Sequence, residues 1–153
     1  MSRRIDSWLR TYCPNISPDQ YQITSPETSD YNCIGWGAEE DDRWWDPIDP
    51  DQYWPDGVPR ELTIAAFIQA YATIDYVPCE SIEFEPGFQK LAIYARDDGQ
   101  PDGGQPTHVA RQLPNGRWTS KIGELEDIEH ELDGLTGFYY GTVAQILKRP
   151  VSS

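Results

Sequence analysis

The chain has 153 residues and carries 12 basic against 26 acidic side chains, which gives a formal charge of −14 at pH 7. This length fits a single domain with one core, in which we assign residues 1–28 to an N-terminal arm and residues 29–150 to the core. The excess of negative charge argues against a nucleic acid or an anionic membrane as a partner, because both would repel the protein. A peptide or amide substrate, or a protein partner, remains compatible with it.

The chain contains three cysteines, Cys13, Cys33 and Cys79, and this odd number does not indicate a disulfide framework. The first residues lack the apolar segment of a signal peptide. No apolar run reaches the length of roughly eighteen residues that a transmembrane helix requires. We therefore expect free thiols and a cytoplasmic protein.

The first predicted element is a short amphipathic helix over residues 4–12, in which Ile5, Trp8 and Leu9 follow helical spacing. Residues 14–30 are rich in Ser, Thr, Pro, Asp and Gln, which is typical of an ordered loop or of an arm that resembles a pro-segment.

Ser29 or Asp30 is predicted to cap a second helix, so that Cys33 falls in the first turn that follows. A helix N-terminus presents free N–H groups and the positive end of the helix dipole, which lower the pKa of a thiol. A thiolate so placed needs a base, and the chain contains two histidines, His108 and His130. These residues suggest a cysteine hydrolase with Cys33 as nucleophile and His108 as base. The alternative is that Cys33 is an inert, buried small hydrophobe.

Residues 39–57 combine acids, prolines and aromatic rings, including Trp54. This composition excludes a regular helix and is too aromatic for disorder, so we expect a packed irregular cap. Two interpretations stay open. The rings of Trp36, Trp44 and Trp45 line a substrate groove, or the rings of the cap complete the core.

The remaining elements are predicted from apolar spacing and turn residues. They are a core helix over 59–74, a buried strand over 91–95, a hairpin of strands 107–113 and 117–121, a surface helix over 124–135 and a last strand over 139–150. Helices thus prevail in the first half and strands in the second. This order is the pattern of an α+β domain with an antiparallel sheet.

The hairpin places His108 at the head of a strand, and pairing through its turn sets His108 opposite Ser120. The Ser120 hydroxyl is then expected to orient the imidazole, as the third member of a catalytic triad does. His130, Asp127 and Glu126 are alternative orienting residues. A metal site formed by Cys33, His108 and His130 lacks the support of a Cys-x-x-Cys or His-x-x-x-His pair, so we expect no metal and no cofactor.

Two further residues are expected to contact the substrate. Asn32 directly precedes the nucleophile, where it or Tyr31 offers a second donor to an oxyanion. Lys121 lies next to Ser120 and either binds a substrate carboxylate or pairs with local acids.

A cysteine at a helix start, a histidine at the head of a strand and a polar residue in the neighbouring strand resemble papain-like hydrolases in their compact NlpC-type form. The resemblance implies acyl transfer, with Cys33, His108 and Ser120 in the catalytic positions, although that family usually has His, Asn, Gln or Glu in the third position. The chain also resembles an uncharacterised bacterial domain family. Its motifs here are Tyr31-Asn32-Cys33-Ile34, Trp44-Trp45, Tyr53-Trp54-Pro55, Pro59-Arg60-Glu61, Thr107-His108, Trp118-Thr119-Ser120-Lys121 with Gly123, and Glu126-Asp127-Ile128 with His130.

The sequence therefore supports two hypotheses. The first is a cysteine amidase or peptidase on a papain-like α+β fold, with helices first and the sheet second. The second is a catalytically inert binding or regulatory module on the same fold, whose Trp-rich cap binds a protein or peptide.

Overall fold

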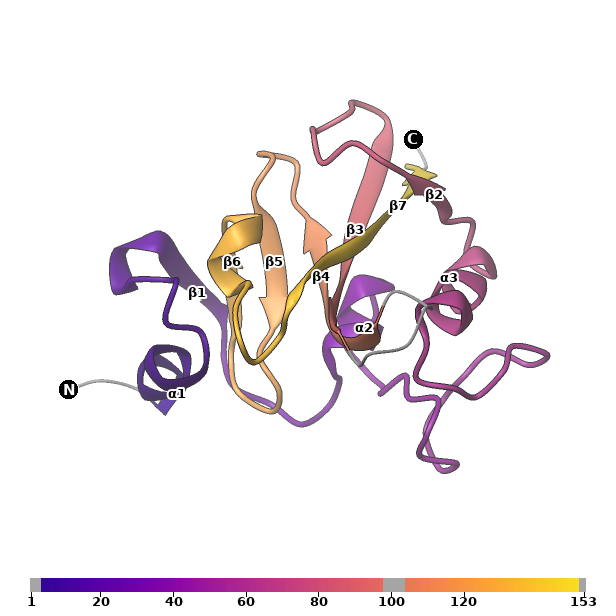
Figure 1. Cartoon of the computed structure of the whole chain (residues 1–153), viewed down its shortest axis with the longest axis horizontal. Coiled ribbons are helices and arrows are strands. Elements are labelled where there is room, and N and C mark those ends of the chain that lie inside the picture. Colours follow the sequence, from indigo (N-terminus) through magenta and orange to yellow (C-terminus); the bar gives the residue numbers. More distant parts are fainter. Residues whose placement is uncertain (1–3, 98–103, 152–153) are drawn as a thin grey trace.

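The computed structural model describes residues 4–97 and 104–151. A seven-stranded sheet runs through it in the order β1-β6-β5-β4-β3-β7-β2, and all neighbouring strands are antiparallel (Figure 1). The strands are β1 (Tyr21–Ser25), β2 (Val77–Cys79), β3 (Phe88–Arg96), β4 (Gln105–Gln112), β5 (Trp118–Lys121), β6 (Asp127–His130) and β7 (Thr142–Pro150).

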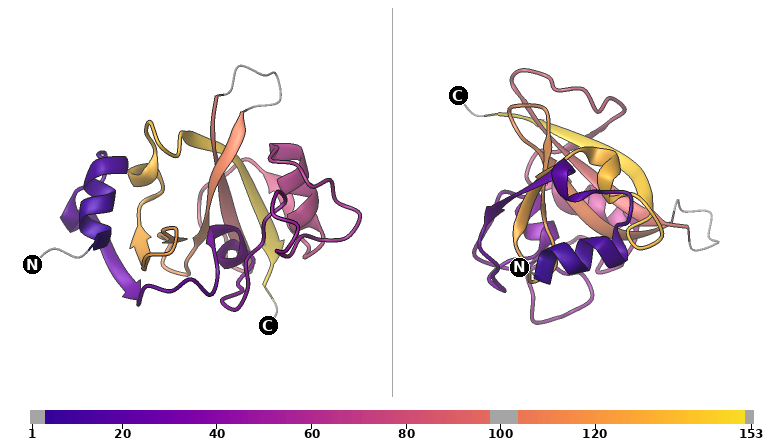
Figure 2. Two further views of the ribbon diagram at one scale, coloured as in Figure 1. Left: turned by 90° about the horizontal axis from the view of Figure 1, so that it is seen from below. Right: turned by 90° about the vertical axis from the view of Figure 1, so that its left-hand side faces the viewer.

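The helices are short and lie around this sheet. They are α1 (Arg4–Tyr12), α2 (Cys33–Gly37) and α3 (Ile64–Ala72), with two 3₁₀ turns, η1 (Pro18–Gln20) and η2 (Leu132–Leu135). Helix α1 lies beside β1 at one end of the sheet, and α3 lies beside β2 at the other end (Figure 1). Figure 2 shows the first of these ends turned toward the viewer, with α1 across it.

The expected papain-like α+β fold with helices first is wrong. Strands dominate the described part of the chain, and its helices are short. One edge strand, β1, already lies within the first 30 residues, and the other, β2, follows α3 at residues 77–79. Strand β1 lies within residues 14–30, which were expected to form a loop. Its side chains alternate between half-buried and exposed, so a mostly polar segment still gains one packed face and a ladder with β6 whose register shifts between Ile23 and Ser25.

Several local predictions are confirmed. The helix over 4–12 is α1, the buried run 91–95 lies in β3, the hairpin is β4 and β5, and the last strand is β7. The core helix predicted over 59–74 is α3, but it is shorter and begins at Ile64, after its cap Thr63.

The surface helix predicted over 124–135 is wrong, because this segment forms strand β6 followed by η2. Strand β6 pairs with β5 on one side and β1 on the other, so its backbone groups are satisfied across the sheet. Ile128 and His130 alternate onto one face of the sheet, where both are fully buried. Pairing on two sides outweighs the helical spacing of Leu125, Ile128 and Leu132.

Two hydrophobic clusters occupy the two faces of the sheet. The first holds Ile5 and Leu9 of α1 against Tyr94 and Trp118, and we call its side the α1 face. The second face carries α2 and α3. Its cluster is made of Ile34, Ala38, Trp45, Trp54, Ala66, Phe67, Ala70, Tyr71, Tyr76, Leu91, Ile93, Val109 and Leu147, and we call its side the α2 face.

Candidate functional site

Cys33 lies in the first turn of a helix, as predicted, but α2 begins later than expected, at Cys33 itself, and its cap is Asn32 rather than Ser29 or Asp30. The Asn32 Oδ1 accepts hydrogen bonds from the N–H of Gly35 at 3.0 Å and of Trp45 at 3.1 Å. The Asn32 Nδ2 donates to the Trp45 carbonyl at 2.8 Å. The side chain of Asn32 therefore joins the start of α2 to the Trp-rich cap, and its expected role as a substrate donor conflicts with these three bonds.

Glycine at position 37 lets α2 approach the sheet closely. A Cβ atom there would lie 2.7 Å from Val109 Cγ1 and 2.9 Å from the Tyr71 hydroxyl. That hydroxyl donates a 2.7 Å hydrogen bond to the Ile34 carbonyl. Small residues and one buried tyrosine thus hold α2 directly over β4.

The Cys33 thiol lies where α2 meets β4. The backbone N–H groups of Val109, Cys33 and Ile34 and the charge of Lys121 favour its thiolate. Burial outweighs them and raises the pKa of Cys33 to about 11. The predicted effect of the helix start is present, but the thiol is protonated at neutral pH.

His108 lies in β4 and pairs with Tyr94 on β3. Its ring stacks on Tyr140 with 4.2 Å between ring centroids, and it is 2 % exposed. The Nε2 atom is buried and has no hydrogen-bond partner. Burial, followed by the charge of His130, lowers the pKa of His108 to about 3, so the imidazole is neutral.

The structure brings the backbone of His108 next to the Cys33 sulfur. The N–H that faces this sulfur belongs to Val109, and its peptide group also contains the His108 carbonyl. The His108 ring, however, packs with Tyr94 on the α1 face, while Val109 packs on the α2 face. Among the residues that the structure describes, no hydrogen bond joins the thiol to the His108 ring.

The expected pairing of His108 with Ser120 is not formed. Strand β4 pairs with β5 at Gln112 with Trp118, a register that leads to Ala110 opposite Ser120. The Ser120 hydroxyl instead lies 2.7 Å from Nε2 of His130. The predicted orienting residues, Ser120 and His130, thus form a pair of their own.

Lys121 is fully buried and points to the α2 face. Its ammonium donates to the carbonyl of Gly123 at 2.9 Å and to that of Leu125, and it lies 5.3 Å from the centre of the Tyr31 ring. Burial lowers the pKa of Lys121, and Asp127 and other acids nearby oppose this. These contacts fix the local backbone. They do not require either expected role of Lys121, which was to bind a substrate carboxylate or to pair with local acids.

Asp127, which was expected on a surface helix as an alternative orienting residue, is fully buried in β6. Its Oδ2 accepts hydrogen bonds from the hydroxyls of Tyr31, at 2.6 Å, and of Ser25, while Oδ1 is buried without a partner. The motif that contains Asp127 was the sequence signal for it. The predicted surface helix, however, did not indicate that its side chain points inward. Asp127 thus joins β1 and β6 to the segment that precedes Cys33.

The three tryptophans expected to line a groove have different surroundings. Trp36 is half-buried, stacks on Tyr31 and donates to the Thr119 hydroxyl at 3.1 Å. Trp44 donates to the Ser29 carbonyl at 2.7 Å. Trp45 is fully buried, so it completes the core.

Within residues 4–97 and 104–151, no three His, Cys, Asp or Glu side chains gather into a metal-binding group. In the same ranges, no helix combines the length and the apolar character needed to cross a membrane.

The family model of a domain of unknown function (DUF7689) matches residues 22–148, and the chain therefore belongs to this family. This confirms that the chain is an uncharacterised domain, whereas nothing supports the likeness to NlpC-type hydrolases. No curated protein and no solved structure matches the chain.

Proposed function

We propose that the protein is a cysteine-dependent hydrolase of amide or ester bonds, with Cys33 as nucleophile and His108 as base. The observation that carries the proposal is the position of the Cys33 sulfur. It lies at the first residue of a helix, faces three backbone N–H groups and adjoins the peptide group of a histidine whose Nε2 has no partner. Such N–H groups stabilise negative charge on sulfur or on an oxyanion.

In the resting state both catalytic groups are neutral. As the sulfur attacks a carbonyl carbon, His108 Nε2 accepts the thiol proton and the carbonyl π pair moves to oxygen. Collapse of the tetrahedral intermediate breaks the bond to the amine or alcohol, which takes the proton from His108. Water then attacks the thioester with His108 again as base, which releases the acid and restores the thiol.

This mechanism requires the β4 backbone around His108 to rearrange, because the His108 ring lies on the α1 face, the Cys33 sulfur lies on the α2 face, and side-chain rotation does not carry a ring across a sheet. Burial raises the pKa of Cys33 and lowers that of His108. A polar substrate that enters the site reduces both effects and brings the two pKa values closer together. Substrate binding thus activates the pair.

The proposed substrate is a peptide or another amide, and the proposed location is the cytoplasm. All three cysteines are free thiols, which supports a reducing compartment. The alternative, a binding module that uses the Trp-rich cap, loses support because Trp45 and Trp54 are 0 % and 4 % exposed.

The test uses p-nitrophenyl acetate as a probe of acyl transfer, with acetylation of each cysteine followed by peptide mass spectrometry. We expect Cys33 to be acetylated and p-nitrophenolate to be released over several turnovers. Cys33→Ala and His108→Gln should each lower the turnover rate at least tenfold. Cys79→Ser is the matched control, because Cys79 lies at a sheet edge, and it should leave the rate unchanged.

Thermal unfolding of each variant shows whether it is folded. The proposal fails if folded Cys33→Ala retains the wild-type rate. It also fails if acetyl transfer to Cys33 is unaffected in folded His108→Gln.

A further inference from the structure

A second site lies on the α1 face, away from Cys33. A cavity of about 520 Å³ opens between the loop at residues 82–84 and the segment that contains η2. Gln112 and Trp118 belong to its wall, and both side chains are nearly buried. Its volume is within the range of small-molecule sites in proteins.

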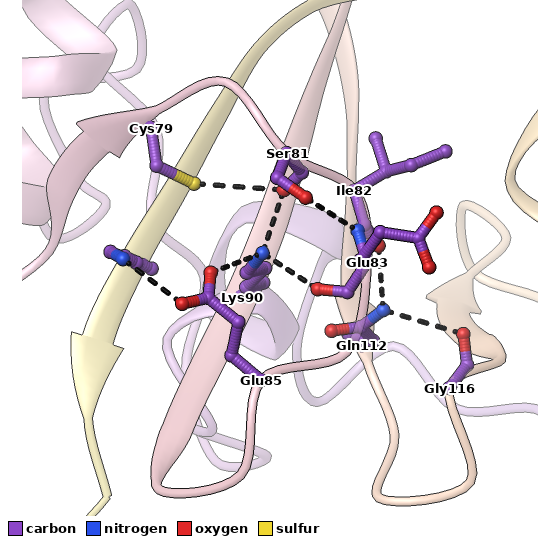
Figure 3. Close-up of polar contacts among 9 residues, drawn as sticks. Cys79, Ser81, Ile82, Glu83, Glu85, Lys90, Gln112 and Gly116 are labelled. Atoms are coloured by element: carbon purple, nitrogen blue, oxygen red, sulfur yellow. Dashed lines mark hydrogen bonds and ion pairs between the residues drawn. The ribbon is translucent and has the colours of Figure 1, made fainter.

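The loop at residues 82–84 is held in place by a buried ammonium. Lys90 is 0 % exposed, and its Nζ donates to the carbonyls of Ser81 at 2.7 Å and Glu83 at 2.6 Å (Figure 3). The same ammonium forms a 2.7 Å ion pair with Glu85. This side of the cavity is therefore preformed and needs no ordering when a ligand binds.

Gln112 presents an unused acceptor. Its Nε2 donates to the carbonyls of Ile82 at 3.0 Å and of Gly116 at 3.4 Å (Figure 3), and because carbonyls only accept, the orientation of the amide is fixed. Its Oε1 is buried without a partner, although the side chain is 5 % exposed. Of the described residues with a buried side-chain atom that lacks a partner, Gln112 is the one that lines the cavity. A buried acceptor in this state is satisfied by an N–H donor.

The charged residues that line the cavity are all acidic. Glu83, Glu131 and Asp133 line it, and Glu131 pairs with Arg117 at 2.7 Å. Within the described ranges, Glu83 and Asp133 form no ion pair. An adjoining cavity of about 310 Å³ shares Glu131 and Asp133, and its wall also contains no cationic residue.

The remainder of the wall is apolar. Ile82 and Phe84 are 50 % and 42 % exposed, and they face a wall that also contains Trp118, Leu132 and Val143. Apolar surface, two uncompensated carboxylates and an unused acceptor together define one kind of ligand. We propose that this cavity binds a small organic amine, a cation with an aromatic or aliphatic body and at least one N–H group.

The test compares three probes that share one ring system but differ in charge: tryptamine, indole and indole-3-propionate. Binding is measured by titration calorimetry and by the shift of the Trp118 indole N–H resonance, assigned with Trp118→Phe. We expect tryptamine to bind at least tenfold more tightly than either other probe and to shift the Trp118 resonance. Comparable affinities for tryptamine and indole-3-propionate, or no shift of Trp118, would overturn the proposal.

Two surface variants test the charge directly. Glu83→Gln and Asp133→Asn should each weaken tryptamine binding about threefold or more, and the loss should shrink in high salt. Asp56→Asn is the matched control, because Asp56 is equally exposed and does not line the cavity. Equal affinities of all three variants and the wild type would contradict the assignment. Because the substituted residues are exposed, these variants are expected to fold.

Discussion

Ser120 and His130 share a 2.7 Å hydrogen bond between neighbouring strands that fixes the tautomer of a buried imidazole. His130 Nδ1 lies 2.7 Å from the Glu131 carbonyl, which only accepts, so Nδ1 carries the proton. Nε2 then accepts the hydrogen of the Ser120 hydroxyl. Protonation of Nε2 would reverse this bond, with Nε2–H donating to the Ser120 oxygen, and would place a charge in the core.

Stability should therefore fall with acid before the carboxylates titrate. Burial lowers the pKa of His130 to about 4 and that of His108 to about 3, against about 6.5 in the unfolded chain. As the pH falls, the unfolded chain binds these protons before the folded chain does. The stabilisation by the neutral imidazoles is therefore complete above about pH 6.5 and is lost as the pH falls toward 4. Lowering the pH from 7 to 5 should therefore reduce the free energy of unfolding by about 1 to 2 kcal/mol for each imidazole. Urea unfolding at the two pH values measures it.

His130→Gln should reduce this pH dependence by the share of one imidazole, whatever its effect on stability at pH 7. An unchanged difference between pH 7 and pH 5 would show that His130 is not neutral and buried.

The Cys33 thiol should react slowly with iodoacetamide. A pKa of about 11, against 9.0 for a free thiol, lowers the thiolate fraction at pH 8 by about a hundredfold. The alkylation rate should keep rising to about pH 10, with no inflection near pH 7. Peptide mapping after timed alkylation measures the rate at each cysteine, and an inflection below pH 8 would refute the neutral resting thiol.

Gly141 should tolerate no side chain. Its φ is +83°, and a Cβ atom would meet the Ala95 carbonyl oxygen at 2.0 Å. Gly57 has a similar φ of +82° with no atom within 4 Å. Gly57→Ala should lower the free energy of unfolding by about 1 kcal/mol, from backbone strain alone. Gly141→Ala should lower it by more than about 3 kcal/mol. Chemical denaturation compares the two, and equal losses would contradict the close packing of Gly141 against β3.

Removing the Tyr31 hydroxyl should weaken the link between Asp127 and the segment before Cys33. Tyr31→Phe deletes one of two hydroxyl donors to a buried carboxylate, which should cost about 1 to 2 kcal/mol. Tyr53→Phe is the control, because in the described part of the chain the Tyr53 hydroxyl makes no hydrogen bond. Tyr53→Phe should lower the free energy of unfolding by less than about 0.5 kcal/mol, as measured by urea unfolding. Equal costs for the two variants would argue against the Asp127 contact.

Local features of the fold were predictable where neighbouring residues decide them. The spacing of Ile5 and Leu9 gives α1 its bounds, and the turn at Asn115 gives the hairpin. Strand β1 was missed because its partner, β6, lies more than a hundred residues later, and nothing within Tyr21–Ser25 identifies that partner. Strand β6 was missed for the same reason, because its pairing with two neighbouring strands outweighs the helical spacing of its apolar residues.

The candidate site was predictable in its composition but not in its geometry. Cys33 does lie in the first turn of a helix beside the strand of His108, as its sequence context indicated. The raised pKa of Cys33 depends on burial from several elements, which sequence spacing does not reveal. Which residue bonds to the Ser120 hydroxyl depends on the register of the hairpin and on whether residues 127–130 form a strand or a helix.

The pairing of β1 with β6 has a consequence for synthesis of the chain on the ribosome. Residues 21–25 leave the ribosome long before residues 127–130, and β2 likewise waits for β7. Both edge strands must therefore remain unpaired until the central strands have been made. Nascent chains are then most open to aggregation or chaperone binding in their first half, and folding should proceed slowly because closure over long sequence separations precedes the gain of contacts.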